Sequence, residues 1–336
     1  MTTVAVVGAG AWGTAFACHL ASRAHAAPKV LLCWRDAAAA SAADAARENA
    51  RYLPDVALPP SLQCTADLTL AARADLLILA VPVAVLPELV RALAATGARA
   101  PLVSLSKGFV SAPASPAGVA LAHQVLAPMW PAPVAVVSGP SFAAEVARGL
   151  PTALTVAATD AALAEQVAVL VRGDAMRAYP SDDIAGVEVG GAVKNVLAIA
   201  AGACDGLDFG HNARAALITR GLAETARLVH AFGGRRETIM GLAGLGDLVL
   251  TCTGNLSRNR QVGLALARGE PLPNILAQLG HVAEGVGAAR AVGALVQHLG
   301  IDMPICVAVD RMLHEGLSAR DAVLALLQRE PRAEGV

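Results

Sequence analysis

The sequence predicts an α/β protein, with an N-terminal Rossmann-type parallel-sheet domain followed by an all-helical C-terminal domain. In the first half, short Val/Leu/Ile runs alternate with alanine-rich stretches, a pattern typical of a parallel sheet with helical crossovers. A glycine-rich turn follows the first run, and beyond about Asp182 only segments of helical period remain. The 336 residues suffice for two domains of ~100–200 residues each. We expect these domains to span residues 1–182 and 183–330.

Six apolar runs in residues 1–182 have the length of strands. These runs are apolar throughout, which favours strands that are covered on both faces. In a sheet with one face open to water, apolar and polar residues alternate along each strand. Ala37–Ala46 holds eight alanines and is expected to be a helix, since alanine has the highest helix propensity. The expected strands are Val4–Val7, Val30–Trp34, Leu76–Val81, Leu102–Leu105, Val134–Val137 and Ala153–Ala157.

Residues 183–330 carry apolar side chains at helical spacing in long segments that Gly and Pro punctuate. We find no convincing strand there and no flexible linker at the boundary. The final residues, Arg329–Val336, are expected to fray. The clearest helical segments are Val193–Ala203, Ala215–Phe232, Ala288–His298 and Ala319–Gln328.

The charge balance argues against proteins that bind polyanions over an extended surface. The 26 basic and 27 acidic side chains leave a net charge of −1, which gives no long-range field to attract nucleic acid or anionic lipid. The mean hydropathy of +0.55 owes much to alanine, and we find no stretch of the ~20 apolar residues that a spanning helix needs. The longest apolar run, Leu76–Pro87, has 12 residues and contains Pro82. Because Thr3–Val7 already reads as a strand and not as a leader, we expect a cytoplasmic protein.

The cysteines indicate neither a disulfide framework nor a metal site. They are scattered, without a C-x-x-C pair and without histidines at metal-ligand spacing. We therefore expect no metal and six buried, reduced thiols. These are Cys18, Cys33, Cys64, Cys204, Cys252 and Cys306.

The segment from Gly8 to Gly13 follows the first expected strand directly and opens a helix. In that context Gly8 permits a tight turn, Gly10 lets a pyrophosphate approach the backbone, and Gly13 lets the helix pack closely on the strand. The start of the helix offers unpaired N–H groups and the positive end of its dipole to phosphates. A glycine-rich turn without a ligand is the alternative, but the strand before it and the helix after it favour a dinucleotide site.

The end of the second strand bears on the choice between NADPH and NADH. Dinucleotide sites of this kind usually carry Asp or Glu there, about 20 residues after the glycines, to hold the ribose 2′-hydroxyl. Here Arg35 lies 22 residues after Gly13 and is followed by Asp36. An arginine at that place pairs with a 2′-phosphate, so the sequence favours NADPH. Asp36 keeps NADH possible, and the alternative for Arg35 is a plain surface residue at a strand end.

Lysine is rare in this chain: only Lys29, Lys107 and Lys194 contribute to the 26 basic residues. An ammonium donates a proton in a way that guanidinium does not, so a retained lysine indicates chemistry, although solvation in a turn explains Lys29. Lys107 follows the strand Leu102–Leu105, at the edge where open α/β sheets bind ligands. Lys194 lies in an apolar helix, where a charge needs a partner. The alternative for each is a lysine that snorkels at the end of an element, which suits Lys107 better than Lys194.

A second polar cluster lies further along the helical half. Asp247 interrupts an apolar run and is a natural partner for a buried lysine. Ser257, Arg258 and Asn259 lie in an expected turn and supply donors suited to a small phosphate. A solvated loop is the alternative for this turn.

Seven motifs stand in order along the chain, from residue 4 to about residue 325. They are Gly8-x-Gly10-x-Trp12-Gly13-Thr14-Ala15, Arg51-Tyr52-Leu53-Pro54, Ser106-Lys107-Gly108, Ser138-Gly139-Pro140-Ser141-Phe142-Ala143, Gly191-Ala192-Val193-Lys194-Asn195, Gly246-Asp247-Leu248 and Ser257-Arg258-Asn259. Together they closely resemble the bacterial type of NAD(P)-dependent glycerol-3-phosphate dehydrogenase. One departure is Ala11, where members often carry Ser, but backbone N–H contacts to the cofactor phosphates are expected to survive it.

This resemblance implies an oxidoreductase that interconverts dihydroxyacetone phosphate and sn-glycerol 3-phosphate with NADPH, NADH remaining possible, and supplies glycerophospholipid synthesis. It also implies a homodimer, and a helical substrate domain in which Lys194 is the general acid/base. The implied substrate contacts are Lys107, Gly139, Ser141, Lys194, Asp247, Ser257, Arg258 and Asn259. The implied cofactor contacts are Gly8, Gly10, Ala11, Trp12, Gly13, Arg35, Lys107, Ala143, Arg258, Val282 and Glu284.

The chemistry of these residue types agrees with a ketone reduction. Hydride addition to a carbonyl carbon leaves negative charge on the oxygen, which a nearby ammonium stabilises and protonates. We expect Lys194 to do this. Burial lowers the pKa of a lysine and an ionised Asp247 raises it, and the sequence leaves that balance open.

Two other functions fit parts of the pattern. A two-domain dehydrogenase for 6-phosphogluconate or a branched 2-keto acid shares the glycine turn and a helical lysine, but is not expected to combine Ser138–Phe142 with Ser257–Asn259. A module that senses NAD(P)H without turnover is the rival from another class. His211, beside Asn212 at the start of a helix, is a further candidate, although a surface or capping histidine is the more common outcome.

Overall fold

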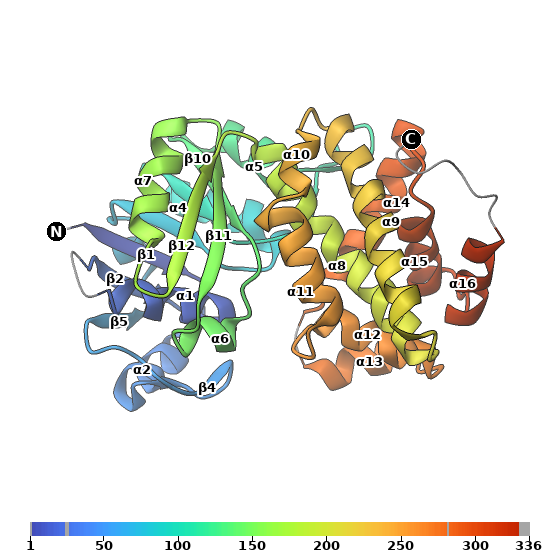
Figure 1. Cartoon of the computed structure of the whole chain (residues 1–336). Coiled ribbons are helices and arrows are strands. Elements are labelled where there is room, and N and C mark those ends of the chain that lie inside the picture. Colours follow the sequence, from blue (N-terminus) through green and yellow to red (C-terminus); the bar gives the residue numbers. More distant parts are fainter. Residues whose placement is uncertain (1, 24–26, 281, 329–336) are drawn as a thin grey trace.

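An eight-stranded sheet forms the first half of the protein (Figure 1). The computed structural model describes residues 2–23, 27–280 and 282–328, so the expected fraying of Arg329–Val336 lies outside the described residues. All six expected strands are confirmed to within two residues at each end, and two strands that the sequence did not reveal lie at the sheet edges. In spatial order the strands are β12 (Met176–Ser181), β11 (Thr152–Ala158), β10 (Val134–Ser138), β7 (Leu102–Ser104), β6 (Leu76–Leu79), β1 (Thr3–Val7), β2 (Lys29–Cys33) and β5 (Leu62–Thr65).

The sheet is parallel apart from one strand pair. β1 pairs in parallel with β2 on one side and β6 on the other, and the parallel order continues through β7 to β10. β10 and β11 run antiparallel, which corrects the expectation of a wholly parallel sheet. The chain order reverses beside β1, and open α/β sheets bind ligands in the crevice outside the carboxyl ends of strands at such a point.

Helices cover both faces of the sheet, as the continuous apolar strands predicted. Val4 of β1 packs in a core with α1 (Ala11–Ala21), whereas the next residue, Ala5, packs in the opposite core with α4 (Leu86–Ala95). The predicted alanine-rich helix forms as α2 (Ala37–Ala46). The remaining elements of this half are β3 (Glu48–Asn49), β4 (Leu53–Ala57), α3 (Leu68–Ala71), η1 (Val83–Val85), β8 (Val110–Ser111), β9 (Val119–Ala120), α5 (Ala122–Leu126), η2 (Ala127–Met129), α6 (Ala143–Ala147) and α7 (Ala161–Val171).

After Ser181 the described part of the chain contains no strand, and helices surround the long helix α8 (Ile184–Gly206). The four helical segments read from the sequence are confirmed as parts of α8, α9, α14 and α16. The other elements are α9 (Gly210–Ala231), α10 (Arg236–Ile239), η3 (Leu242–Gly246), α11 (Asp247–Thr253), α12 (Arg258–Ala267), α13 (Leu272–Leu279), α14 (Glu284–Leu299), α15 (Pro304–His314) and α16 (Ala319–Leu327).

Glycines bring α12 against the backbone of α8. A methyl group on Gly202 would lie 2.0 Å from the carbonyl oxygen of Arg260, and one on Gly263 would lie 2.0 Å from that of Ile199. No side chain fits at either position, so the two helices touch backbone to backbone. This close approach fixes the start of α12 relative to α8, which carries Lys194.

α8 corrects the expectation that no segment is long and apolar enough to cross a membrane. It has 23 residues, and an 18-residue window of it has a mean hydropathy of 1.5. The segments Arg236–Thr253 and Arg258–Ala267 pass the same test only as a pair bent by 48°. However, 94% of the α8 window is buried inside the protein, as expected for the core helix of a globular fold.

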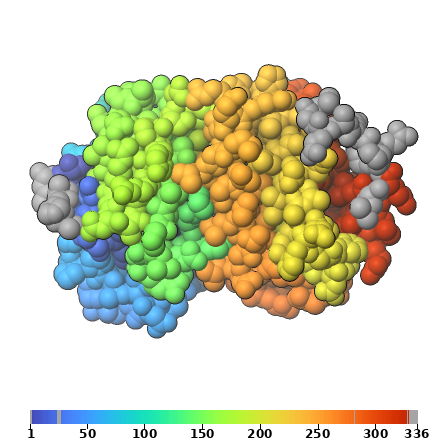
Figure 2. Space-filling model, viewed as in Figure 1, coloured from blue at the N-terminus to red at the C-terminus, as the bar shows by residue number. Residues whose placement is uncertain are grey.

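The two halves are in direct contact along the middle of the molecule. In Figure 2 the green segments of the sheet half lie against the orange segments of the helical half. α8 packs on β10 and β11, and η3 packs on β11. Lys107, which follows β7, and Val83, which follows β6, form hydrogen bonds with Asp247 and Glu284, so the carboxyl ends of these central strands face the helical half.

The cysteines are all free, and five of the six are buried. Cys64 is only partly buried, which corrects the expectation for that residue. Burial raises the pKa of Cys18, Cys33 and Cys252 to about 12, so these thiols stay protonated at neutral pH.

Candidate active site

Three residues from distant parts of the chain form one ionic cluster between the two halves. Asp247, the first residue of α11, accepts a hydrogen bond from Lys194 Nζ at Oδ1 and one from Lys107 Nζ at Oδ2, both at 2.5 Å. Asp247 is only 1% exposed, and Lys194 is also buried. Asp247 was predicted as the partner of a buried lysine, and the structure pairs it with both.

Neighbouring polar groups complete the hydrogen bonding of this cluster. Lys107 Nζ also donates to the backbone oxygen of Gly139 at 3.2 Å, and the Ser141 hydroxyl donates to the same oxygen at 2.9 Å. Lys194 Nζ donates to the Thr251 hydroxyl at 3.1 Å, which in turn donates to the backbone oxygen of Asp247 at 2.6 Å. Sequence reasoning missed Thr251, although it lies one helical turn after Asp247 and so on the same face of α11.

A π-helical turn places Asp247. η3 (Leu242–Gly246) ends directly before this residue, and π-turns are rare and are often found at functional sites. Gly244 in this turn is required, because a methyl group there would lie 2.1 Å from the backbone oxygen of Ile239. The run of small residues around Asp247 was visible in the sequence, but nothing in it distinguishes a π-turn from an α-helix.

The electrostatic balance that the sequence left open is settled by burial. Burial lowers the pKa of Lys194 to about 8, and the positive charge of Lys107 lowers it too. The carboxylate of Asp247 raises this pKa, but its effect is smaller than that of burial. For Asp247 the outcome is reversed: burial alone would raise its pKa, but the two ammonium groups together hold it below its usual range. At neutral pH the cluster therefore holds one carboxylate, with Lys194 close to its titration range.

The glycine-rich turn has the shape that a pyrophosphate needs. Gly8 adopts a φ of +116°, and a methyl group on Gly13 would lie 1.9 Å from the Gly8 oxygen, so both glycines are required by the fold itself. A methyl group on Gly10 would meet no atom within 4 Å. Gly10 is the N-cap residue of α1 and has no side chain with which to cap the first N–H groups of that helix. The turn thus leaves open space at a helix N-terminus, which fits a dinucleotide phosphate.

The next two residues of the turn, Ala11 and Trp12, are partly buried at the start of α1. The indole of Trp12 packs edge-on against Phe16, with ring centroids 5.5 Å apart. Ala143 lies partly buried at the start of α6, another helix that begins at this edge of the sheet.

Arg35 and Asp36 have different surroundings at the end of β2. The Asp36 carboxylate accepts a hydrogen bond from Ala39 N at 2.7 Å and so caps α2. Arg35 is exposed and forms no ion pair with any described residue. Asp36 is therefore engaged by the fold, whereas the Arg35 guanidinium is available to a ligand.

The start of α12 is tied to α8 directly beside Lys194. The amide of Asn259 donates to the side-chain oxygen of Asn195 at 2.9 Å, and its own oxygen accepts from Gly285 N at 3.0 Å. Ser257 caps α12 by accepting from Arg260 N at 3.2 Å. The structure thus gives Asn259 and Ser257 structural hydrogen bonds in addition to the ligand contacts expected of them, and places Arg258 on the surface beside them.

Glu284 connects the helical half to the sheet half. Its carboxylate accepts a hydrogen bond from Val83 N, just beyond β6, at 3.3 Å. Burial raises the pKa of Glu284, while the Val83 hydrogen bond and the charge of Arg258 lower it. Arg258 and Glu284 therefore share one electrostatic environment at the junction, and nearby Val282 is 53% exposed.

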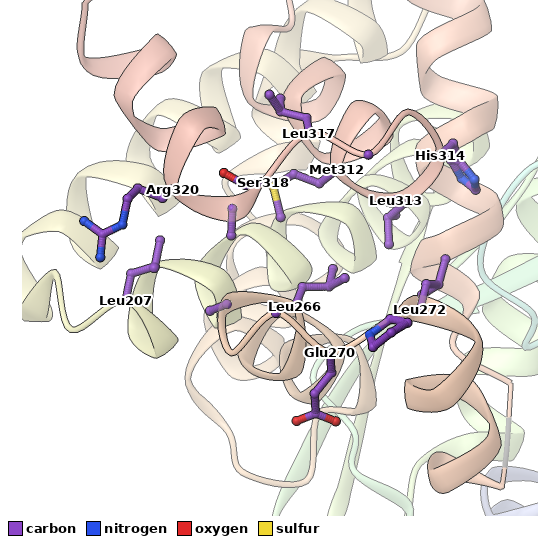
Figure 3. A pocket seen from close by; sticks show the side chains of 15 residues that line it. Leu207, Leu266, Glu270, Leu272, Met312, Leu313, His314, Leu317, Ser318 and Arg320 are labelled. Carbon is purple, nitrogen blue, oxygen red and sulfur yellow. The ribbon is translucent and has the colours of Figure 1, made fainter.

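Two other features lie outside this set. His211 is exposed on α9 and its ring Nδ1 lies 2.8 Å from Nη2 of Arg214, so it is a surface histidine. A cavity of about 570 Å³ opens between α12, α13, α15 and α16, and none of the candidate site residues lines it. Figure 3 shows its lining, with Leu266 and Met312 near the centre of the view, Glu270 below them and Arg320 to the left.

Comparisons with known proteins agree with this geometry. The N-terminal family model of NAD-dependent glycerol-3-phosphate dehydrogenase matches residues 3–164, and the C-terminal model matches residues 183–324. A relative named glycerol-3-phosphate dehydrogenase (NAD(P)+), from Thiobacillus denitrificans, is 54% identical over 332 residues, which cover 98% of both chains. Another of that name, from Methylibium petroleiphilum, is 53% identical over 338 residues, covering 99% of this chain and 98% of the relative.

The solved structures give the same result. The crystal structure of glycerol-3-phosphate dehydrogenase from Coxiella burnetii superposes with a TM-score of 0.91 at 41% identity, over 98% of this chain and 99% of that one. A ketopantoate reductase from Ralstonia eutropha, of the kind considered as a rival, reaches a TM-score of only 0.60 at 16% identity and shares the fold alone. The chain belongs to the NAD-dependent glycerol-3-phosphate dehydrogenase family.

Proposed function

We propose that this protein catalyses the reversible, NAD(P)H-dependent reduction of dihydroxyacetone phosphate to sn-glycerol 3-phosphate. One observation carries the proposal: Lys194, a buried amine with a pKa of about 8, is held by Asp247 where the helical half meets the carboxyl edge of the sheet. The names of the close relatives specify dehydrogenases that act on glycerol 3-phosphate with NAD(P)+.

Lys194 acts as the proton donor in reduction. A dinucleotide held at the glycine-rich turn would supply the hydride that the carbonyl carbon of the substrate accepts. The Lys194 ammonium stabilises the negative charge that develops on the carbonyl oxygen and transfers its proton to that oxygen. In the reverse direction the neutral amine accepts the proton from the substrate hydroxyl, and a pKa of about 8 makes both protonation states accessible near neutral pH.

Asp247 and Lys107 hold this amine in place. Asp247 orients the Lys194 ammonium through its Oδ1, with Thr251 as the second anchor. Lys107 occupies Oδ2, so the carboxylate stays ionised, and the second ammonium adds positive charge for the substrate phosphate or alkoxide. We assign Gly139 and Ser141, which support Lys107, to the same substrate site.

The substrate phosphate binds at the start of α12, where Ser257, Arg258 and Asn259 supply donors. This assignment is supported by the Asn259–Asn195 hydrogen bond, because Asn195 directly follows Lys194 and so sets the distance between the phosphate and the amine.

The dinucleotide binds across the edge of the sheet. Gly8, Gly10, Ala11, Trp12 and Gly13 hold its pyrophosphate, and Arg35 holds the 2′-phosphate of NADPH. Lys107, Ala143, Arg258, Val282 and Glu284 complete the site toward the nicotinamide end. The Glu284–Val83 hydrogen bond supports this placement, because it joins the two halves beside the end of β6.

Turnover of NADPH tests the proposal against its rivals. The reduced-nicotinamide absorbance is followed in separate assays. Its loss reports reduction of dihydroxyacetone phosphate or of a branched 2-keto acid by NADPH, and its gain reports oxidation of 6-phosphogluconate by NADP⁺. We expect turnover only with the dihydroxyacetone phosphate pair. NADPH binding without any substrate-dependent loss would instead identify a sensing module, and faster turnover of another substrate would identify a different dehydrogenase.

The finer assignments rest on the same resemblance. We propose a dinucleotide-binding unit of residues 1–182 and a substrate unit of residues 183–330, supported by the end of β12 at Ser181 and the start of α8 at Ile184. We also propose a cytoplasmic homodimer that supplies glycerophospholipid synthesis. Sedimentation velocity tests the dimer, and a single species with the mass of one chain would refute it.

A further inference from the structure

Asn49 is an asparagine buried beside the glycine-rich turn. It lies in the two-residue strand β3, in a hairpin outside the main sheet, and is only 1% exposed. Its amide nitrogen donates to the backbone oxygen of Ala9 at 2.9 Å and to the Thr14 hydroxyl at 2.8 Å. Its amide oxygen accepts from Tyr52 N at 3.3 Å. Every polar atom of this side chain is used, and both donated bonds go to the turn or to the helix that follows it.

The bond to Ala9 controls the orientation of one peptide group. The Ala9 carbonyl and the Gly10 N–H belong to the same planar, trans peptide unit, so they point in opposite directions. Drawing the carbonyl toward Asn49 therefore turns the Gly10 N–H away from the hairpin. No described residue accepts a hydrogen bond from this N–H, and Gly10 is the position where a methyl group would meet no atom.

We propose that Asn49 is a positioning residue for the cofactor, which holds the Ala9–Gly10 peptide so that the Gly10 N–H faces the dinucleotide pyrophosphate. This inference rests on the proposed function, because it requires NAD(P)H at the turn. The bond to Thr14 anchors the same amide to the first turn of α1, so the turn and the start of the helix keep one relative orientation. Without Asn49 the Ala9–Gly10 peptide is free to rotate. Cofactor binding then has to order this peptide, and the entropic cost weakens the binding.

Arg47, the residue directly before this hairpin, provides a matched control. Its guanidinium donates to the backbone oxygens of Pro59 at 2.5 Å and Leu62 at 2.7 Å, beyond the end of the hairpin. Arg47 also pairs with Asp44 at 2.9 Å, and it forms no hydrogen bond or ion pair with the described residues of the glycine-rich turn. Replacing Arg47 loosens the hairpin, whereas replacing Asn49 releases the peptide.

The first test compares Asn49→Ala with Arg47→Met in the full-length protein. NADP⁺ and NADPH dissociation constants are measured by direct titration, and kcat, the KM for dihydroxyacetone phosphate and the melting temperature are measured beside them. We expect Asn49→Ala to weaken cofactor binding about tenfold or more, because the Ala9–Gly10 peptide is no longer held in the orientation that binds the cofactor. Its kcat at saturating NADPH and its KM for dihydroxyacetone phosphate should stay within about threefold. Arg47→Met should lower the melting temperature and leave the dissociation constants unchanged.

The Asn49→Asp variant tests the positioning role through the pH dependence of NADP⁺ binding, which a purely structural residue would not change. An ionised carboxylate cannot donate to the Ala9 oxygen, but the protonated acid can. A carboxyl group buried at this position has a raised pKa, so its protonation falls in an accessible range. The ratio of the NADP⁺ dissociation constant of this variant to that of the wild type should therefore fall steadily as the pH is lowered.

The outcomes separate this inference from the proposed function. Wild-type cofactor affinity in Asn49→Ala, equal weakening in Arg47→Met, or a pH-independent ratio for Asn49→Asp would each overturn the positioning role. If Asn49→Ala does not fold, the Asn49→Asp titration decides alone. A wild-type protein that binds neither nucleotide would contradict the proposed function itself, before any variant is made.

Discussion

Lys194 and Asp247 lie 53 residues apart in the chain, and their Nζ and Oδ1 atoms are 2.5 Å apart in the structure. Lys107 contacts the other carboxylate oxygen at the same distance. Two ammonium groups against one carboxylate leave surplus positive charge in a largely buried site. A developing alkoxide and a phosphate both need such a charge, which connects this contact to the proposed reaction.

The pKa of Lys194 sets the pH dependence of the reaction. Burial lowers this pKa to about 8 despite the opposing charge of Asp247. Reduction uses the protonated amine, so kcat for dihydroxyacetone phosphate should fall as the pH rises through about 8, and the oxidative kcat should rise. Asp247→Asn removes the group that raises the pKa, so both transitions should move to lower pH, which pH–rate profiles of the two proteins will check.

The same substitution also affects stability, because it leaves two ammonium groups without their carboxylate. Breaking a buried ion pair by removing one partner costs ~3–5 kcal/mol of unfolding free energy, and we expect Asp247→Asn to lie near the lower end because the lysines retain partial exposure. Denaturant unfolding measures this loss. A variant with wild-type stability and an unshifted pH profile would contradict the electrostatic account of the cluster.

Two glycines of the turn should respond differently to alanine. Gly10→Ala adds a methyl group that meets no protein atom, at an ordinary φ of −72°, so the melting temperature should hold while the NADPH dissociation constant rises about tenfold. Gly13→Ala places a methyl group 1.9 Å from the Gly8 oxygen and should cost at least about 2 kcal/mol of unfolding free energy. Thermal melts and NADPH titrations of both variants check this, and equal NADPH affinity in Gly10→Ala and wild type would argue against a pyrophosphate at Gly10.

Arg35 should determine the preference for NADPH. It is exposed and unpaired among the described residues, whereas Asp36 is engaged as the cap of α2. Arg35→Asp should lower the ratio of kcat/KM for NADPH to that for NADH by about 10- to 100-fold, because the 2′-phosphate loses a charged partner and meets a carboxylate.

Asp36→Ala is the matched control for Arg35→Asp. It removes the cap of α2 and should cost ~0.5–2 kcal/mol of stability without changing the coenzyme ratio. If Asp36→Ala changes the coenzyme preference and Arg35→Asp does not, the two roles are exchanged.

Glu224 should make the stability of the protein depend on pH. Burial raises its pKa to about 7, although its carboxylate accepts hydrogen bonds from Ile305 N and Cys306 N at the start of α15. The folded state then binds a proton that the unfolded state releases near pH 4.5, so the stability gained by protonation is complete below that pH and is lost as the pH rises to about 7.

Glu224→Gln should abolish this part of the pH dependence. The difference in unfolding free energy between wild type and variant should change by about 2–4 kcal/mol between pH 4.5 and pH 7.5. Urea unfolding at several pH values measures it. A difference that stays constant with pH would show that Glu224 is ionised throughout and acts only as a helix cap.

The sequence revealed elements whose pattern is local and missed those that depend on tertiary packing. The central strands could be predicted because both of their faces are buried, so their sequences are continuous apolar runs. Edge strand β12 was missed because its residues alternate between buried and exposed and include Pro180, which resembles a loop. α8 begins at Ile184, before the segment Val193–Ala203 that shows the clearest helical period, because Gly190 and Gly191 weaken that pattern. Packing explains Gly190, since a methyl group on it would lie 2.8 Å from the Ala243 oxygen.

Parts of the site could be predicted because their signals are also local in the sequence. The glycine-rich turn and the isolated lysines have strong chemical signatures, and the resemblance placed the remaining residues. The contact of Lys107 with Asp247 joins residues 140 positions apart, and no local pattern indicates it. Asn49 was likewise invisible, because a single asparagine in a short hairpin indicates a turn until its partners Ala9 and Thr14 are known.

Lys194→Ala tests the central claim most directly, with Lys29→Ala as a control because Lys29 is the exposed first residue of β2. Loss of the proton donor should reduce kcat for dihydroxyacetone phosphate by at least ~100-fold, while the NADPH dissociation constant stays within about twofold. Lys29→Ala should match the wild type in both measurements. Wild-type turnover in Lys194→Ala, with NADPH bound normally, would contradict the assignment of this lysine as the acid and base of the reaction.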